Sequence, residues 1–282
     1  SSAAGRVCCS PLNDSLSEWS NVRLPDMRAG RILAGKIGGG SVLSEGDRSL
    51  ARIVDLSHLL YSGMPVFPGD PPVEFVRAST IKESGYHVTT VRFGTHAGTH
   101  VDTPSHVLFD DTAVDSLALD DLVGWAEVLD LGELAPGSEI TAAHLDVFSD
   151  RVRSESRVIL KTGWSRYVGQ ENYFTAYPSL SEGAAMWLPA RCVKLLAVEQ
   201  PSVHLTEHVK IHKLLLSERL VLVEGLANTA ELTHDRVYLV ALPLKLQGLD
   251  GSPMRVIAIE GADAPEPPPD DSAEGNSFGR RV

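Results

Sequence analysis

The stretch that decides how this chain is interpreted is FGTHAGTHVDTPSH, residues 93–106. His96, His100 and Asp102 fall on even positions in it, and Gly98 lies between the two histidines. Because side chains alternate between faces along a strand, an extended backbone would point all three to one side. Two imidazoles and a carboxylate around a bare glycine suit a divalent cation with an open coordination position. The stretch therefore predicts a catalytic metal site on a strand.

The end of the stretch adds a candidate for proton transfer. Pro104 cannot donate to a strand ladder and is predicted to end the strand, which would place His106 just past the cation. A closed structural zinc site is less favoured, because such sites prefer cysteine and no cysteine lies near residues 93–106. A purely structural use of these in-phase side chains is the other alternative.

The pattern H-x-G-T-H-x-D-x-P-x-H, read from His96 to His106, resembles the signature of the cyclase family, which includes bacterial-type kynurenine formamidases and isatin hydrolases. Weaker likenesses to this family follow in order between residues 52 and 260: DLSH (55–58), MPVFPGD (64–70), QPSV (200–203), HKLL (212–215), VEGL (223–226), LPLK (242–245) and GSPMR (251–255). The resemblance implies an α/β fold, a layered β/β/α domain of the swivelling type with mixed sheets and few helices.

The resemblance also implies a set of metal ligands. His96, His100 and Asp102 would bind one cation. Asp102 would bridge to a second cation held by His212, and Glu224 would contact both.

Further roles follow from the same resemblance. His106 matches the proton donor and acceptor of the family, and Phe67 stands where an aromatic residue, often tryptophan, contacts substrate in formamidases. Gln200 stands where an aspartate or threonine is frequent. Ser202 is expected to orient substrate rather than attack it, because no G-x-S-x-G elbow surrounds it.

The second ligand set can also be weighed from the residues alone. His208 and His212 stand four apart on a predicted helix and share a face, but no H-E-x-x-H glutamate accompanies them, so an independent helical zinc site is not favoured. His212 borders the core, whereas His208 is expected in an outer shell or at the surface.

Glu224 ends an apolar strand, where an unpaired carboxylate is costly to bury. Metal coordination would explain Glu224, and a buried salt bridge is the alternative.

Composition narrows the class of protein. The chain has 282 residues, 43% of them hydrophobic, which is enough for one substantial core or two small ones. A net charge of −12 argues against nucleic acid, and the sequence has no apolar run of about 18 residues that could span a membrane. Cys8, Cys9 and Cys192 cannot form a disulfide framework, so a cytoplasmic protein is expected, with organelle targeting by the N-terminal segment left open.

The pattern along the chain predicts three regions. Residues 1–50 are expected to be a flexible or partner-contacting extension, 51–261 the hydrolase domain, and 262–282 a disordered acidic, proline-rich tail. Strands are predicted at 52–56, 88–93, 126–131, 158–162, 194–198, 220–224, 237–242 and 254–259. Helices are predicted at 141–148, 181–188 and 207–217, with Thr141 and Thr206 as N-caps.

The leading functional hypothesis is metal-dependent hydrolysis of the C–N bond of a small aromatic amide. The resemblance makes an arylformamidase, which converts N-formylkynurenine to kynurenine and formate, the first expectation, and an isatin-type lactam hydrolase the alternative. A non-catalytic protein that binds a metal and a metabolite is an alternative of another class. One or two Zn²⁺ ions are expected, with Mn²⁺ second. The resemblance further implies a homo-oligomer, a dimer or tetramer.

Overall fold

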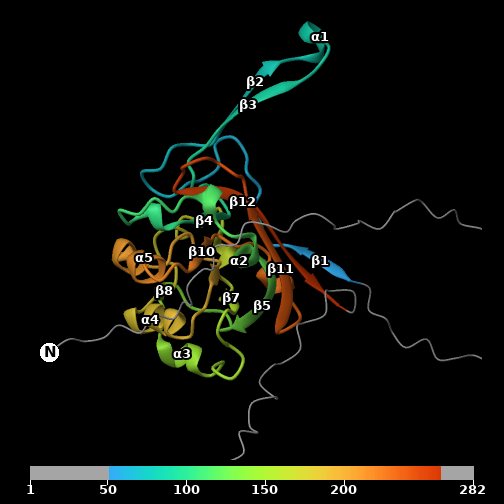
Figure 1. The fold of residues 1–282 in the computed structure, drawn as a ribbon. Helices are drawn as coiled ribbons and strands as arrows, with labels where there is room; N and C mark the ends of the chain where they lie inside the picture. Colours follow the sequence, from blue (N-terminus) through green and yellow to red (C-terminus); the bar gives the residue numbers. More distant parts are fainter. Residues whose placement is uncertain (1–50, 262–282) are drawn as a thin grey trace, which may run out of the picture. The chain divides into compact units, whose positions relative to one another are not determined.

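A computed structural model describes residues 51–261 of the chain (Figure 1). The predicted extension over 1–50 and the predicted tail over 262–282 lie outside these residues. Within 51–261, no helix is long and apolar enough to cross a membrane.

Seven strands close into one mixed sheet. They are β4 (His100–Asp102), β5 (Val123–Asp130), β7 (Arg157–Lys161), β9 (Leu195–Val198), β10 (Val221–Glu224), β11 (Arg236–Pro243) and β12 (Gly251–Glu260). Their order is β12-β11-β5-β7-β9-β10-β4, and β4 pairs back onto β12. The pairs among β5, β7, β9 and β10 are parallel, and the others are antiparallel. The long β12 closes the ring because its first residues pair with β4 while its last residues pair with an eighth strand, β1 (Arg52–Asp55).

Alternation along these strands separates an interior from an outer face. One buried apolar cluster takes residues from all seven strands, among them Val101 of β4 and Val223 of β10. Their chain neighbours His100, Asp102 and Glu224 therefore project from the outer face.

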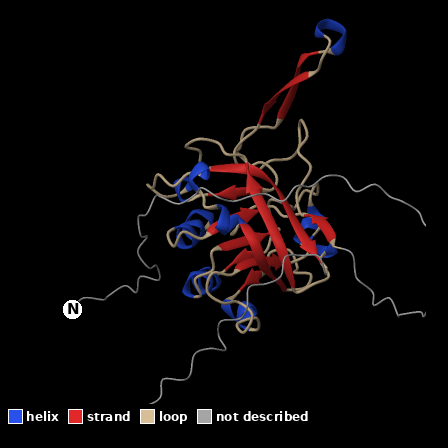
Figure 2. Cartoon of the chain, turned by 45° about the vertical axis from the view of Figure 1, so that its right-hand side comes forward, coloured by secondary structure: helices blue, strands red, loops and turns tan. Residues whose placement is uncertain are grey.

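Three helices cover part of that outer face (Figures 1 and 2). They are α3 (Ala142–Asp146), α4 (Glu182–Ala190) and α5 (His208–Leu216). A second buried cluster joins outward strand residues such as Leu196 and Leu222 to helix residues such as Leu188 and Leu215. The outer face of β4 and β10 thus lies where α5 can reach it, since α5 packs on β10.

A two-stranded arm projects from the closed sheet (Figures 1 and 2). It consists of β2 (Glu74–Ser79), the short helix α1 (Ile81–Ser84) and β3 (Val88–Arg92). All residues of β3 are exposed, and no residue of α1 is buried. The remaining elements are α2 (Leu119–Leu122), β6 (Glu139–Ile140), β8 (Ser179–Leu180) and the 3-10 helices η1 (Pro104–His106), η2 (Val114–Ser116), η3 (Trp164–Tyr167) and η4 (Thr229–Glu231).

Each predicted strand and helix has a counterpart in the structure, shifted at its ends by a few residues. The predicted mixed sheet with few helices is confirmed, while the more specific β/β/α layering of the swivelling type stays a prediction. Thr141 caps α3 through a capping box. The prediction of Thr206 as cap of α5 is wrong, because the N-cap is Glu207, without a side-chain hydrogen bond. The His204 imidazole instead accepts the backbone N–H groups of Thr206 and Glu207.

Candidate metal centre

The in-phase strand predicted through His96 is wrong in part. The strand β4 begins only at His100, so His100 and Asp102 do share its outer face, whereas His96 lies in the preceding turn. Gly98, with φ of 68°, takes the left-handed conformation that turns the backbone there. His96 nevertheless reaches the same place, with its Nδ1 2.7 Å from Asp102 Oδ1.

The strand β10 and helix α5 supply the other two predicted ligands. Glu224 pairs in register with His100, so the two outward side chains are neighbours, and His100 Nε2 lies 3.5 Å from Glu224 Oε2. His212 of α5 points its Nε2 at both carboxylates, 3.1 Å from Asp102 Oδ2 and 3.2 Å from Glu224 Oε1. The structure therefore brings the five predicted ligands together into one cluster.

The outward nitrogen of each imidazole is already bonded. His100 Nδ1 lies 2.9 Å from the Gly98 carbonyl oxygen, and His212 Nδ1 lies 2.7 Å from the His208 carbonyl oxygen. His96 Nε2 lies 2.8 Å from Asp250 Oδ2. With a cation bound, each outward N–H would donate to an oxygen, and the inward nitrogens that face the carboxylates would give up their protons and serve as lone-pair donors. Metal-binding histidines have this arrangement.

The charges in the cluster also fit a cation. Asp102 and Glu224 have side chains only 1% and 3% exposed. Burial opposes their ionisation, yet His96 and His100 hold the pKa of Asp102 well below its usual range. Burial likewise opposes charge on the imidazoles, but Asp102 raises the pKa of His96 to about 9 and that of His100 to about 10. Glu224 Oε1 is buried without a hydrogen bond, despite its approach to His212, and a bound cation would satisfy it.

His106 lies beside the cluster in η1. Its ring centroid is 4.1 Å from that of His96 and 5.5 Å from that of His212, and it is partly exposed. Its Nδ1 lies 3.4 Å from Asp250 Oδ2. Hydrogen bonds from His106 and His96 hold the pKa of Asp250 well below its usual range. Reasoning from the sequence missed Asp250, which stands 144 residues beyond His106 in a short Gly-Leu-Asp-Gly turn.

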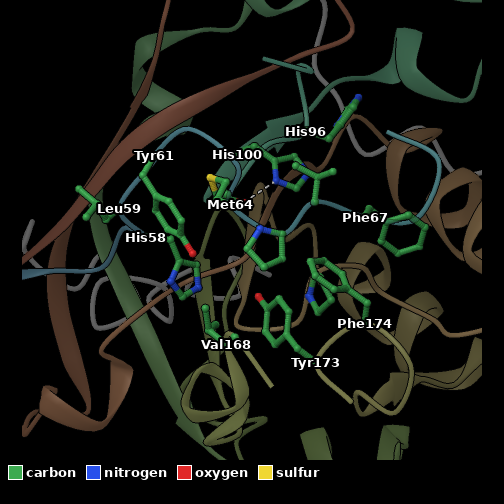
Figure 3. A pocket seen from close by; sticks show the side chains of 15 residues that line it. His58, Leu59, Tyr61, Met64, Phe67, His96, His100, Val168, Tyr173 and Phe174 are labelled. Carbon is green, nitrogen blue, oxygen red and sulfur yellow. Dashed lines mark hydrogen bonds between the residues drawn. The ribbon is translucent and has the colours of Figure 1, made fainter. Parts of the chain in front are cut away.

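An apolar cavity of about 250 Å³ opens beside the cluster, with His96 and His100 in its wall (Figure 3). Phe67 lies in this wall and makes an edge-on contact with Phe174, at 6.1 Å between ring centroids. The other side chains of the wall that Figure 3 labels are His58, Leu59, Tyr61, Met64, Val168 and Tyr173. Of the aromatic residues in this wall, sequence reasoning indicates Phe67 alone.

A second cavity, of about 360 Å³, contains the cluster itself and shares Phe67, His96, His100 and Pro201 with the first. Ser202 is buried and lines this second cavity, and its role in orienting substrate stays a prediction. His208 lines it as well and holds His212 through its backbone carbonyl. Gln200 is buried two residues past the end of β9, and its Oε1 has no hydrogen-bond partner among the described residues.

Comparison with known proteins adds to this geometry. The curated "Kynurenine formamidase" of Salinibacter ruber is 32% identical over 219 residues, which cover 76% of this chain and 99% of the relative. The solved structure of isatin hydrolase A from Labrenzia aggregata matches with a TM-score of 0.69 at 24% identity, over 75% of this chain and 94% of the other. A structure described as a potential metal-dependent hydrolase with cyclase activity matches with a TM-score of 0.65 at 24% identity, over 76% and 100% of the two chains.

The closed mixed sheet carries a buried cluster of histidines and carboxylates that could hold a metal ion, and the curated relatives are hydrolytic enzymes. Residues 54–204 match the Cyclase family model, described as "Putative cyclase", and the chain belongs to this family.

Proposed function

We propose that residues 51–261 form a metal-dependent arylformamidase, which hydrolyses the C–N bond of N-formylkynurenine or a closely similar aryl formamide. The observation that carries the proposal is the cluster of three imidazoles and two buried carboxylates next to an apolar cavity. The 32% identity to a curated kynurenine formamidase over 99% of that relative supports this substrate class.

Two subsites for cations are suggested by how the carboxylate oxygens are shared. Asp102 Oδ1 lies against His96 and His100, and Asp102 Oδ2 lies against His212. Glu224 divides in the same way, with Oε2 toward His100 and Oε1 toward His212. Asp102 and Glu224 would therefore bridge two ions.

Zn²⁺ is the first candidate because imidazole and carboxylate ligands suit it, and Mn²⁺ is the second. When bound, the cation supplies Lewis acidity, which polarises a carbonyl and makes water a nucleophile at neutral pH. Elemental analysis of protein purified without added metal tests this choice. Less than about half an equivalent of any transition metal would contradict the predicted site.

His106 has the position of the acid–base group. With Nδ1 turned toward Asp250, its Nε2 is free for the cavity that holds the cluster. It would accept a proton from the attacking water and return it to the leaving nitrogen as the C–N bond breaks.

The apolar cavity sets the size of the aromatic part. An apolar cavity of about 150 Å³ holds a benzene ring. The cavity of about 250 Å³ beside the cluster therefore has room for one ring and a short substituent. The rings of Phe67 and Phe174, which contact each other edge-on, can contact such a group. Formyl is the smallest acyl group, so it fits a carbonyl site crowded by the cluster and His106.

A substrate panel tests the proposal. Aryl formamides, isatin-type lactams and simple aryl esters are compared with and without chelator, and we expect chelator-sensitive hydrolysis with aryl formamides preferred. Faster turnover of isatin than of any formamide would make the lactam hydrolase the better assignment. No hydrolysis of any member by fully loaded protein would contradict the proposal and favour the metal- and metabolite-binding alternative.

The variant His106→Ala separates an enzyme from a binding protein. We expect turnover to fall by about 10²-fold or more while the metal content stays the same, because removing a general acid–base group costs this much. Unchanged turnover would contradict the role of His106. Loss of metal would instead make His106 a ligand, which its closeness to His96 and Asp102 allows.

We also propose that the chain forms at least a dimer, with the projecting arm packed against a second copy. Val76 and Val91 on the arm are 60% and 50% exposed, and a two-stranded ribbon is marginally stable by itself in water. Light scattering at micromolar concentration is expected to show a dimer or tetramer for the parent and a smaller species for the double variant Val76→Ser/Val91→Ser. The matched control is Val147→Ser, 76% exposed at the end of α3. A monomeric parent would contradict this proposal.

A further inference from the structure

Asp250 occupies the turn just before β12, where one of its oxygens contacts two histidines. Oδ2 lies 2.8 Å from His96 Nε2 and 3.4 Å from His106 Nδ1. His96 directs its other nitrogen at Asp102, and His106 lines the cavity that contains the cluster. A single carboxylate thus contacts both a predicted metal ligand, His96, and the predicted acid–base group, His106.

The surroundings of Asp250 hold it in place independently of the histidines. Thr95 Oγ1 donates to its Oδ1 at 3.2 Å. Its backbone carbonyl accepts from Thr103 N at 3.1 Å and from Thr103 Oγ1 at 3.0 Å. These threonines directly precede His96 and directly follow Asp102, so Asp250 is tied to both ends of the ligand run. A carboxylate anchored in this way can orient its partners.

We propose that Asp250 is a positioning residue that sets the tautomers of His96 and His106 during hydrolysis. This inference rests on the proposed function. Asp250 accepts the Nε2–H of His96, which leaves His96 Nδ1 as the lone pair for the cation. It accepts the Nδ1–H of His106, which leaves His106 Nε2 as the base that faces the substrate.

The proton path that follows leaves Asp250 ionised throughout. His106 Nε2 takes a proton from the attacking water and becomes an imidazolium, whose charge the Asp250 carboxylate stabilises. Nε2 then gives this proton to the leaving nitrogen as the C–N bond breaks. Asp250 itself gains and loses no proton, and its effect on the rate passes through His106.

The opposing interpretation is that Asp250 only anchors the turn before β12. A simple anchor would affect every substrate to the same degree. A positioning residue for a general acid has a different effect, because protonation matters most when the leaving amine is strongly basic. The two interpretations therefore differ in how the loss of rate depends on the leaving group.

The test uses the full chain and the variants Asp250→Asn, His106→Ala and the double variant, with formanilides whose ring substituents vary the basicity of the leaving aniline. At saturating Zn²⁺, we expect Asp250→Asn to lower kcat by about 10–100-fold, the typical effect of removing an outer-shell partner. The loss should grow with leaving-group basicity, and KM should stay within about threefold. In the His106→Ala background, Asp250→Asn should change kcat by less than about twofold, since both act through one group.

Zinc affinity, measured by competition with a chromophoric chelator, provides a readout that does not depend on turnover. We expect Asp250→Asn to bind Zn²⁺ about 10–100-fold more weakly through its effect on His96. The matched control is Asp111→Asn, an exposed carboxylate outside the site, which should leave affinity and kcat unchanged.

Three outcomes would overturn the inference: parental zinc affinity in Asp250→Asn, an equal loss of kcat for all formanilides, or full additivity with His106→Ala. A parent protein that binds zinc but hydrolyses no formanilide would contradict the proposed function instead. In that case the zinc affinity of Asp250→Asn still decides whether Asp250 positions His96.

Discussion

Gly251→Ala is the most direct test of how His96 is held. A Cβ at this position would lie 2.9 Å from His96 Cε1 and 2.6 Å from the Val101 carbonyl oxygen. Carbon atoms pack best at about 3.5–4.0 Å, so the imidazole would have to retreat by about 0.6 Å or more. The Val101 contact is with backbone, so β4 and β12 would also have to part at the register pair of Gly251 with Asp102.

The size of the effect follows from these contacts. A misplacement of about 1 Å can cost about 10²-fold in rate, so a shift of His96 by about half that is expected to lower turnover by about 10-fold. Overpacking is expected to lower the free energy of unfolding by about 1–3 kcal/mol. Formanilide hydrolysis at saturating Zn²⁺, zinc affinity and urea denaturation measure the three quantities.

The matched control is Gly183→Ala. A Cβ there would meet its nearest neighbour, the Ala142 side chain, at an ordinary 3.7 Å. Gly183 lies in the first turn of α4, so alanine should raise the free energy of unfolding by up to about 1 kcal/mol without changing turnover. Turnover of Gly251→Ala within about threefold of the parent, with full metal content, would refute the packing of His96 against β12 in the working enzyme.

Three further perturbations have expected outcomes. Phe67→Ala should raise KM for formanilide about two- to tenfold with kcat nearly unchanged, because ring contacts contribute about 0.5–1.5 kcal/mol to binding. An unchanged KM would contradict a contact between Phe67 and the substrate. Chelation should abolish hydrolysis and lower Tm in calorimetry, since Zn²⁺ at about 100 times its Kd stabilises the folded state by about 2.7 kcal/mol. An unchanged Tm after chelation would contradict a preformed metal site. Burial would raise the pKa of Glu260, but hydrogen bonds from the backbone N–H groups of Thr233 and His234 outweigh burial and lower it. The ionised carboxylate therefore stabilises the fold above its unfolded pKa, and this contribution is lost as pH falls through the folded pKa. Glu260→Gln should therefore lower the free energy of unfolding, measured by urea titration, by about 1–3 kcal/mol at pH 7, and the difference from the parent should shrink below about pH 4. A difference that persists below that pH would contradict the ionic role of Glu260.

The strands of the closed sheet were predictable because their burial appears in the sequence. The strands β9 and β10 are buried at every position, and their apolar runs stand out from the surrounding chain. The strand β2 was missed because it lies on an exposed arm, where no face is buried and no alternation is required, whereas its equally exposed partner β3 was indicated by its β-branched residues. The three-residue β4 is too short for a periodic pattern, and the histidine motif indicated it instead.

The site was predictable only where its members are close in sequence or carry the family motif. His100 and Asp102 follow the alternation of β4, whereas a left-handed turn at Gly98 brings His96 to the cluster by another route. Asp250 has no local signal because the closure of β12 onto β4 places it there. The pocket residues Tyr173 and Phe174 lie in an irregular segment, where their side-chain directions follow no period.

The two faces of β4 and β10 have a consequence for engineering this enzyme. Val101 and Val223 fill the interior, while the next residues along the same strands, Asp102 and Glu224, project into the cluster. A designer could therefore evolve thermal robustness and substrate scope as nearly independent traits, by varying inward and outward positions in separate libraries. Insertion of a single residue into either strand would exchange the two sets, so length variation there is the one kind of diversity such libraries should leave out.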